Sequence, residues 1–212
     1  MMKRLLMLLC LLPLPAAAAT YVEGRHYAEI ALPQAVETGN KIEVREFFWY
    51  GCPHCYDLEP AIEAWLKKLP RQAQFVRTPG VAPRWLVHAR AYYAFEALGA
   101  LGKTHVAFFK ALHVQKRPLE DEPSLLGFAA ENGVDKEKFR QAFNSFGVRL
   151  KLDKARQLNL EMGIHSVPTL VVDGKYLTTP VMAGGNPEMF KVVEFLIQKA
   201  ARERKSPAKK PQ

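Results

Sequence analysis

Two cysteines separated by two residues, Cys52 and Cys55, form the part of this sequence whose spacing could do chemistry. The apolar run 47–50 that precedes them is typical of a buried strand, and Gly51 ends it. Pro53 suits the first position of a helix, so Cys52 falls at the N-cap and Cys55 one turn further in. We therefore predict a redox-active dithiol at the N-terminus of a helix.

Cys52 is the predicted reactive thiol of this pair. A thiol with an ordinary pKa of about 8.5 is mostly protonated at neutral pH. The helix N-terminus, its backbone N–H groups and a positive charge on His54 lower the pKa of such a thiol. A stabilised thiolate favours the reduced protein, so the disulfide becomes a strong oxidant. Cys55 is expected to be the buried resolving thiol, with a less acidic sulfur.

Other uses of a cysteine pair fit this sequence poorly. Zinc needs about four ligands, and a second cysteine pair is absent from the sequence. Haem attachment would need histidine directly after Cys55, where Tyr56 stands. A purely structural disulfide that closes so small a loop would add little stability. We expect no metal and no cofactor beyond the disulfide itself.

Pro168 is a second candidate site residue, because it opens an apolar run directly before the Asp173-Gly174 turn. A proline at this position is compatible with either a cis or a trans Val167–Pro168 peptide bond.

Glu46 is a third candidate, because it interrupts an apolar strand six residues before Cys52. A buried carboxylate is costly unless it has a partner or a role. Glu46 could relay a proton to or from Cys55. The alternative is an acid that reaches solvent from an edge strand.

The rest of the pattern alternates strand and helix signals. We predict strands over 26–32, 42–49, 74–78, 169–172 and 175–178, and helices over 53–68, 84–99, 103–114, 122–131, 135–144, 147–162 and 186–202. Asn186 is the expected N-cap of the last helix, with Pro187 at its first position. A mixed sheet with helices on both faces and an inserted helical block accommodates this order.

The N-terminal residues predict a secretory signal peptide over 1–19. A basic start at 3–4, a short apolar run over 5–14 and small residues at 17–19 indicate cleavage near Ala19. An uncleaved membrane anchor is the alternative. Cleavage would leave Cys52 and Cys55 as the only cysteines of an exported chain, and one pair is too few to be a disulfide scaffold.

The positive charge of the chain concentrates at its C-terminal end. The formal net charge is +9, and five lysine and arginine residues lie within 202–212. We interpret 203–212 as a basic disordered tail. Nucleic-acid binding would need a basic face on the fold rather than a basic tail, so we expect no nucleic-acid partner.

Together these residues resemble the DsbA family of exported thiol:disulfide oxidoreductases, over about 21–199. The most specific elements are Glu46-Phe47-Phe48, Cys52-Pro53-His54-Cys55-Tyr56, and Val167-Pro168 followed by Asp173-Gly174-Lys175-Tyr176.

The resemblance implies an α/β thioredoxin fold over 20–80 and 163–202, with an all-helical domain inserted over 81–162. It also implies a cis Val167–Pro168 peptide bond that faces the disulfide and contacts substrate.

For the chemistry, the resemblance implies that Cys52 forms a mixed disulfide with a substrate cysteine. Glu46, Glu59 and Arg77 match a charged cluster that the family keeps near the dithiol. The resemblance further implies unfolded exported proteins as substrates, a periplasmic location, and reoxidation by a membrane partner that passes electrons to quinone.

The sequence thus predicts a monomeric oxidase that donates its disulfide to newly exported proteins. One alternative is a disulfide isomerase or reductase, although such proteins usually carry a dimerisation module and none is recognisable here. Another is a chaperone of the thioredoxin fold that binds unfolded chains. Gly51 and the short loop 79–83 depart from the family pattern beside the expected substrate groove, which bears on peptide preference.

Overall fold

The computed structural model describes residues 21–206, so the predicted signal peptide and residues 207–212 lie outside the described residues. The strands are β1 (Ala28–Glu29), β2 (Ile42–Phe48), β3 (Ala73–Pro79), β4 (Thr169–Val172) and β5 (Tyr176–Thr178). The helices are α1 (Pro53–Leu66), α2 (Leu86–Ala97), α3 (Leu101–His113), α4 (Glu122–Glu131), α5 (Lys136–Phe143), α6 (Phe146–Glu161), α7 (Pro180–Ala183) and α8 (Asn186–Lys205), with a 3₁₀ turn η1 (Pro83–Trp85).

The five strands form one mixed sheet in the order β1-β5-β4-β2-β3. Strand β2 runs parallel to β3 and antiparallel to β4, and every residue of β2 is buried. Because β2 has a neighbour on each side, Glu46 does not lie on an edge strand. The alternative that Glu46 reaches solvent from an edge is therefore wrong.

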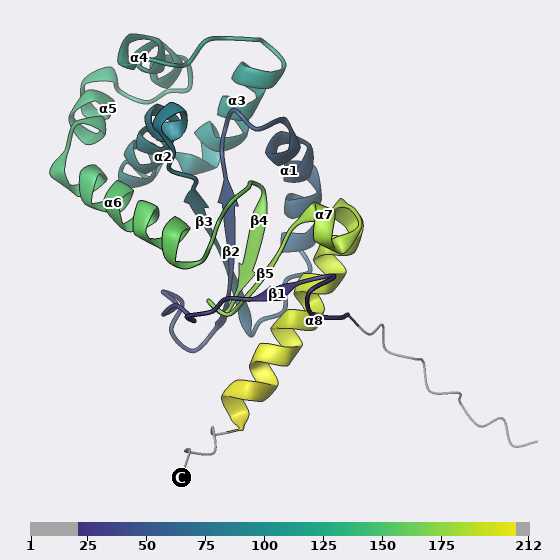
Figure 1. Ribbon diagram of the computed structural model, residues 1–212. Helices are drawn as coiled ribbons and strands as arrows, with labels where there is room; N and C mark the ends of the chain where they lie inside the picture. The colour runs from purple at the N-terminus through teal and green to yellow at the C-terminus, as the bar shows by residue number, and fades with distance from the viewer. Residues whose placement is uncertain (1–20, 207–212) are drawn as a thin grey trace, which may run out of the picture.

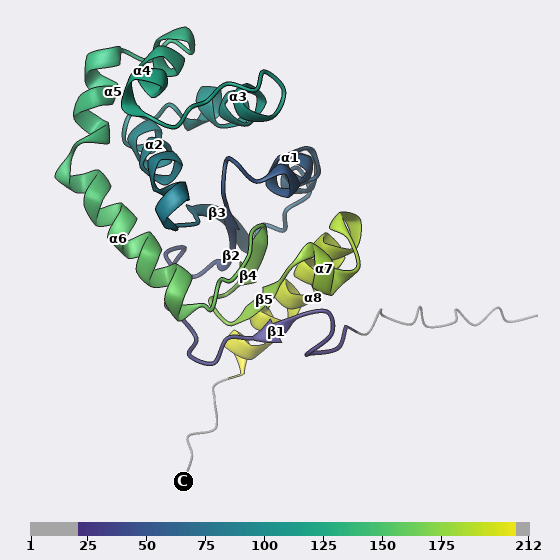
Figure 2. The same ribbon diagram turned by 45° about the horizontal axis from the view of Figure 1, so that its top comes forward.

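Helices α1 and α8 pack against one face of the sheet. Leu58 and Ile62 of α1 meet Leu196 of α8 and Val44 of β2 in one apolar cluster. Helices α2 to α6 form a separate group on the other side of β2, as Figures 1 and 2 both show. This group lies between β3 and β4 in the chain, where the sequence predicts a helical block. The dithiol sits where the two groups of helices meet.

The helical block follows the predicted boundaries closely because its helices have strong local start signals. Asp121, Asp135 and Ser145 each accept a hydrogen bond from a backbone N–H in the first turn of the following helix. The first of these helices begins later than predicted, at Leu86, because Pro83 starts a 3₁₀ turn before it. Residues 180–183 form the short helix α7, which the sequence analysis did not predict.

The Asp173-Gly174 hairpin turn is confirmed, and both residues have positive φ angles, of 57° and 64°. A Cβ atom at Gly174 would lie 2.1 Å from the backbone oxygen of Gln34, so this position needs glycine for space as well as conformation.

The last helix differs from the prediction at both ends. Its N-cap is Gly185, with a φ of 130°, and Asn186 is already helical and caps nothing. At the other end, α8 continues to Lys205, so the prediction that disorder begins at residue 203 is wrong.

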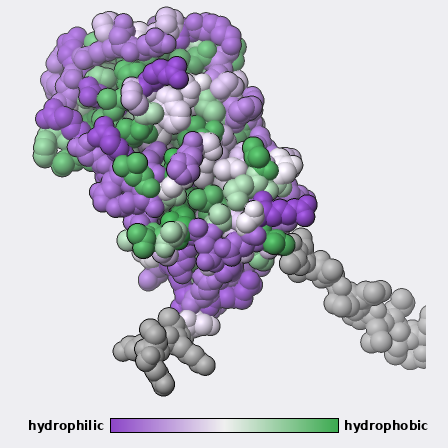
Figure 3. Space-filling view, in the orientation of Figure 1, coloured by the Kyte–Doolittle hydropathy of each residue, from purple (hydrophilic) through white to green (hydrophobic). Residues whose placement is uncertain are grey.

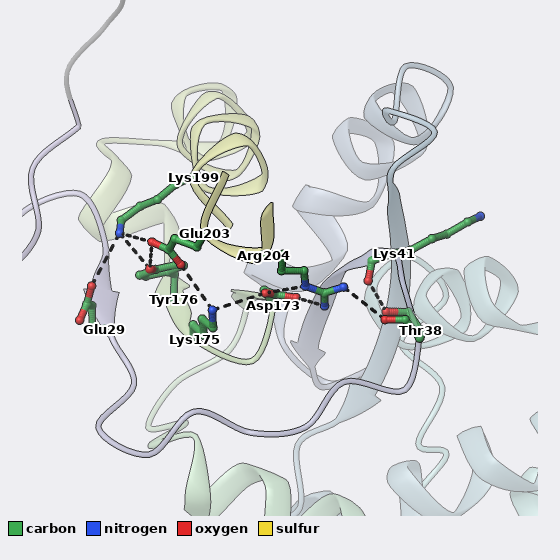
Figure 4. A network of polar contacts seen from close by, with 10 residues as sticks. Glu29, Thr38, Lys41, Asp173, Lys175, Tyr176, Lys199, Glu203 and Arg204 are labelled. Atoms are coloured by element: carbon green, nitrogen blue, oxygen red, sulfur yellow. Dashed lines mark hydrogen bonds and ion pairs between the residues drawn. The ribbon is translucent and has the colours of Figure 1, made fainter. Parts of the chain in front are cut away.

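Ion pairs to the hairpin hold the end of α8 in place, as Figure 4 shows. Arg204 binds Asp173 through its Nε, 3.1 Å from Oδ2, and through a second contact to the other carboxylate oxygen. Glu203 accepts a 2.7 Å hydrogen bond from the Tyr176 hydroxyl and pairs with Lys199 at 2.7 Å. Figure 3 shows hydrophilic residues over this end of α8. Within residues 21–206, no helix has the length and apolar character needed to cross a membrane.

Candidate active site

The two cysteines lie at the start of α1 in the predicted arrangement. Cys52 is the N-cap residue, Pro53 is the first helical residue, and the Cys52 side chain caps no backbone group. The Cys52 sulfur is therefore available for chemistry. Cys52 is 7% exposed and Cys55 is fully buried, so Cys52 is the thiol that a partner can reach. Both are free thiols in the structure.

The surroundings of Cys52 lower its pKa to about 6. The largest cause is a hydrogen bond from the Cys55 thiol, which outweighs the opposing effect of burial. Backbone N–H groups of Cys55 and His54 contribute next, and the charge of His54 contributes least. The predicted direction is confirmed, but the sequence analysis named His54 and the helix end and overlooked Cys55.

Cys55 has the opposite environment. Burial raises the pKa of its thiol far above the ordinary value, and the hydrogen bond to Cys52 and the nearby charges of Cys52 and Glu46 add to the effect. At neutral pH the reduced pair therefore holds its single proton on Cys55 and its negative charge on Cys52. The two sulfurs thus differ in acidity and burial in the direction that the sequence predicts.

The loop before β4 faces the dithiol. The Val167–Pro168 peptide bond is cis, as the resemblance implies, and the Cys52 sulfur lies 3.5 Å from the Val167 carbonyl oxygen. Beside this contact lies a cavity of about 650 Å³ whose surface is mainly apolar. Its lining residues include His54, Ser166, Val167, Pro168, Pro180 and Val181. Val181 on α7 is 91% exposed, so an apolar surface is open to solvent next to the reactive sulfur.

Glu46, Arg77 and Glu59 meet in one buried cluster, although they come from β2, β3 and α1. Glu46 and Arg77 are register partners across the parallel strands, and Arg77 Nε lies 2.9 Å from Glu46 Oε2. Arg77 also pairs with Glu59 at 3.0 Å. Burial raises the pKa of Glu46 to about 8, against the effect of Arg77. The other oxygen, Glu46 Oε1, is buried and has no hydrogen-bond partner among residues 21–206.

Three histidines from the helical block contact the two residues before Gly51, and the sequence analysis missed all three. His88 Nδ1 accepts a 3.0 Å hydrogen bond from the Trp49 indole. His105 lies 2.8 Å from the Tyr50 hydroxyl, and His113 Nε2 donates to the Tyr50 carbonyl oxygen at 2.7 Å. His105 and His113 lie eight residues apart on one amphipathic helix, which is the only local signal for them.

Position 51 needs glycine because the Trp49 side chain, two residues earlier, occupies the space of a Cβ atom. A Cβ atom at Gly51 would lie 2.2 Å from Cζ2 of Trp49. The Trp49 ring covers Gly51 and stacks on Trp85, with 5.0 Å between ring centroids and 14° between planes. The departure from the family pattern at Gly51 is therefore linked to the Trp49–Trp85 stack beside Cys52.

Within residues 21–206, histidine, cysteine and acidic side chains form no group of three that could hold a metal ion. The chemistry available at this site is that of the two sulfurs and of the ionisable groups around them. A buried thiol and a cap-position thiolate at a cis-proline loop define a disulfide oxidoreductase of the thioredoxin fold.

Comparison with known proteins identifies a family within this class of disulfide oxidoreductases. The family model of the DSBA-like thioredoxin domain matches residues 66–196. The chain is 40% identical to the thiol:disulfide interchange protein DsbA of Pseudomonas aeruginosa, over 87% of this chain and 88% of that protein. It is 43% identical to the protein of the same name from Burkholderia cepacia, over 87% of this chain and 86% of that protein.

Solved structures agree with the sequence comparison. The crystal structure of P. aeruginosa DsbA matches with a TM-score of 0.84 and 40% identity, over 88% of this chain and 97% of that one. The oxidoreductase DsbA from Xylella fastidiosa matches with a TM-score of 0.80 and 30% identity, over 88% and 99%. The chain belongs to the DsbA family, and it is a disulfide-donating thiol oxidoreductase with a thioredoxin fold and a helical insertion.

Proposed function

We propose that this protein oxidises pairs of cysteine thiols in newly exported proteins, and that Cys52 is the sulfur that forms the mixed disulfide. The observation that supports this most directly is the contrast between the two sulfurs. Cys52 is reachable and has a pKa of about 6, whereas Cys55 is buried and holds its proton. A thiolate stabilised in this way favours the reduced state, so the disulfide is readily donated.

The proposed reaction has two exchanges. A substrate thiolate attacks Cys52 of the disulfide, a bond forms between these two sulfurs, and the Cys52–Cys55 bond breaks. Its electron pair leaves on Cys55, which takes up a proton. A second substrate thiolate then attacks the substrate sulfur of the mixed disulfide, and Cys52 departs as a stabilised thiolate. The substrate loses two electrons and the protein gains them.

We assign Glu46 the role of proton donor and acceptor for Cys55. A group with a pKa of about 8 is mostly protonated at pH 7 yet can ionise, which suits it to give a proton to a departing thiolate and to recover it. Glu59 and Arg77 support this role electrostatically, since the charge of Glu59 raises the pKa of Glu46 and the charge of Arg77 lowers it. Replacement of Glu46 by Gln should slow the steps in which Cys55 loses or gains a proton and flatten their dependence on pH around 8.

The apolar cavity beside the cis Val167–Pro168 bond is the proposed substrate-binding surface. Its exposed side chains suit an extended, unfolded segment that carries its own apolar residues. The Val167 carbonyl points to the reactive sulfur and could accept a backbone hydrogen bond from the substrate, while His54 and Pro53 flank the same sulfur. We further propose a periplasmic, monomeric protein that a quinone-linked membrane partner reoxidises.

Equilibration with glutathione tests the direction of the reaction. We expect a reduction potential about 150 mV more oxidising than that of thioredoxin, the difference that separates the DsbA family from thioredoxin. A thioredoxin-like potential would refute the oxidase and favour a reductase. The variant pair Cys55→Ser and Cys52→Ser tests the attacked sulfur. The first should accumulate mixed disulfides with a reduced, unfolded substrate, and the second should not.

A further inference from the structure

His105 of α3 contacts both segments that flank the dithiol in the sequence, one before Cys52 and one after Cys55. Its ring is 6% exposed, and each ring nitrogen has a partner. Nδ1 lies 2.8 Å from the hydroxyl of Tyr50, two residues before Cys52. Nε2 lies 3.3 Å from Oε1 of Glu59, four residues after Cys55.

The chemistry of the partners fixes the direction of both hydrogen bonds. Glu59 is ion-paired with Arg77 and can only accept, so His105 Nε2 carries the proton and donates it. A neutral imidazole then has a free lone pair on Nδ1, which accepts from the Tyr50 hydroxyl. Burial lowers the pKa of His105 and raises that of Tyr50, so both side chains are neutral at pH 7.

Glu46 and Glu59 compete for one guanidinium. Arg77 pairs with both, but Glu59 also receives the His105 hydrogen bond. Glu46 instead has a buried oxygen with no partner in the described part of the chain. We propose that His105 is a positioning residue that keeps Glu59 ionised, so that Glu46 rather than Glu59 carries the exchangeable proton near Cys55. The proposal rests on the proton role assigned to Glu46 above.

The other ionisable groups around His105 line a cavity of about 400 Å³ with it: Glu37 from the loop before β2, Arg77 from β3, Glu63 from α1, and Tyr92 and Glu96 from α2. Glu63 lies 4.0 Å from Arg77 on the solvent side of the cluster. These groups stay in place when the His105 side chain is changed. A matched pair of His105 variants therefore isolates the bond to Glu59.

The matched variants are His105→Asn and His105→Gln, whose side-chain amides each replace one ring nitrogen of histidine. In His105→Asn the short amide can still reach the Tyr50 hydroxyl but not Glu59, whereas in His105→Gln the longer amide can donate to Glu59. The ionisation of Glu46 is followed by carboxyl ¹³C NMR in the disulfide form, where neither cysteine titrates, and Glu46→Gln assigns the signal. His88→Gln is the control, because His88 contacts Trp49 and the Leu119 carbonyl but no carboxylate.

We expect the Glu46 titration to move to lower pH by about one unit in His105→Asn. Without the charge-assisted hydrogen bond Glu59 takes up a proton more readily, and a neutral Glu59 leaves more of the Arg77 interaction to Glu46. It should stay within about 0.3 units of wild type in His105→Gln and His88→Gln. An unchanged titration in folded His105→Asn would overturn the proposal.

If neither His105 variant folds, Glu59→Gln tests the same competition, since a neutral side chain leaves Arg77 to Glu46 alone. The Glu46 titration should again fall, and a titration that stays in place would overturn the proposal. Failure of the underlying function looks different. In that case Glu46→Gln would leave the pH dependence of disulfide formation unchanged, whatever the His105 variants do.

Discussion

The structure attributes the acidity of Cys52 chiefly to the Cys55 thiol, and replacement of Cys55 by Ala tests that attribution. A hydrogen bond to a charged group contributes roughly 1.5–3 kcal/mol, and a thiol is a weak donor, so we take the low end. Since 1.36 kcal/mol corresponds to one pKa unit, the pKa of Cys52 should rise from about 6 to about 7 in Cys55→Ala.

Cys55→Ser is the matched control, because its hydroxyl still donates a hydrogen bond and the pKa of Cys52 should stay close to 6. Ultraviolet absorbance of the thiolate as a function of pH reads the pKa directly, and each variant retains a single thiol in the described chain. At pH 6, alkylation of Cys52 should be about fivefold slower in Cys55→Ala, as the thiolate fraction falls from half to about a tenth.

A Cys52 pKa in Cys55→Ala that stays within about 0.3 units of wild type would show that the Cys55 thiol is not the main cause of the acidity. The helix N-terminus and His54 would then be the main causes of the lowered Cys52 pKa, as predicted from the sequence. His54→Ala would in that case produce the larger shift.

Two further predictions concern stability, measured by urea unfolding. Gly51→Ala should destabilise the protein by about 1–3 kcal/mol, because the new methyl group collides with the Trp49 ring; an unchanged stability would show that the ring moves freely. Arg204→Ala should cost about 2 kcal/mol, because it leaves the buried Asp173 carboxylate without its main partner. Arg202→Ala, at an exposed position of the same helix, should cost less than about 0.5 kcal/mol. Equal effects of the two arginine variants would contradict the anchoring of α8.

Short-range patterns allowed most of the fold and the centre of the site to be predicted. The proline at the first helical position and the Asp-Gly turn each act over a few residues, and the structure bears them out. The strand before the dithiol is also present, but it ends at Phe48 rather than continuing to the predicted Trp49. At the start of α8, Gly185 and Asn186 are both residues that suit an N-cap, and the sequence pattern does not rank the two. In the structure Gly185, with a φ of 130°, is the N-cap.

Long-range contacts could not be predicted from local patterns. Glu59 and Arg77 entered only through the resemblance, because α1 and β3 come together through the tertiary fold. The contacts of His105 depend on how α3 packs against α1 and β2, which no spacing in the sequence encodes. The end of α8 was misassigned for the same reason, since the partner of Arg204 is Asp173, in the distant hairpin.

If the folded protein stabilises the Cys52 thiolate, the reduced and disulfide forms must differ in how their stability depends on pH. The pKa of Cys52 is lowered on folding, from about 9 to about 6, so its contribution is complete above pH 9 and is lost as pH falls through 6. The disulfide form has no such thiol and serves as the reference. Linkage gives at most about 2.6 kcal/mol between pH 5 and 8, and about 2 kcal/mol allowing for solvent screening.

Urea unfolding of the reduced and disulfide forms at pH 5 and pH 8 provides the measurement. We expect the reduced form to gain about 2 kcal/mol relative to the disulfide form between these pH values and to be the more stable form at pH 8. A difference independent of pH, or a disulfide form that is the more stable at pH 8, would contradict it.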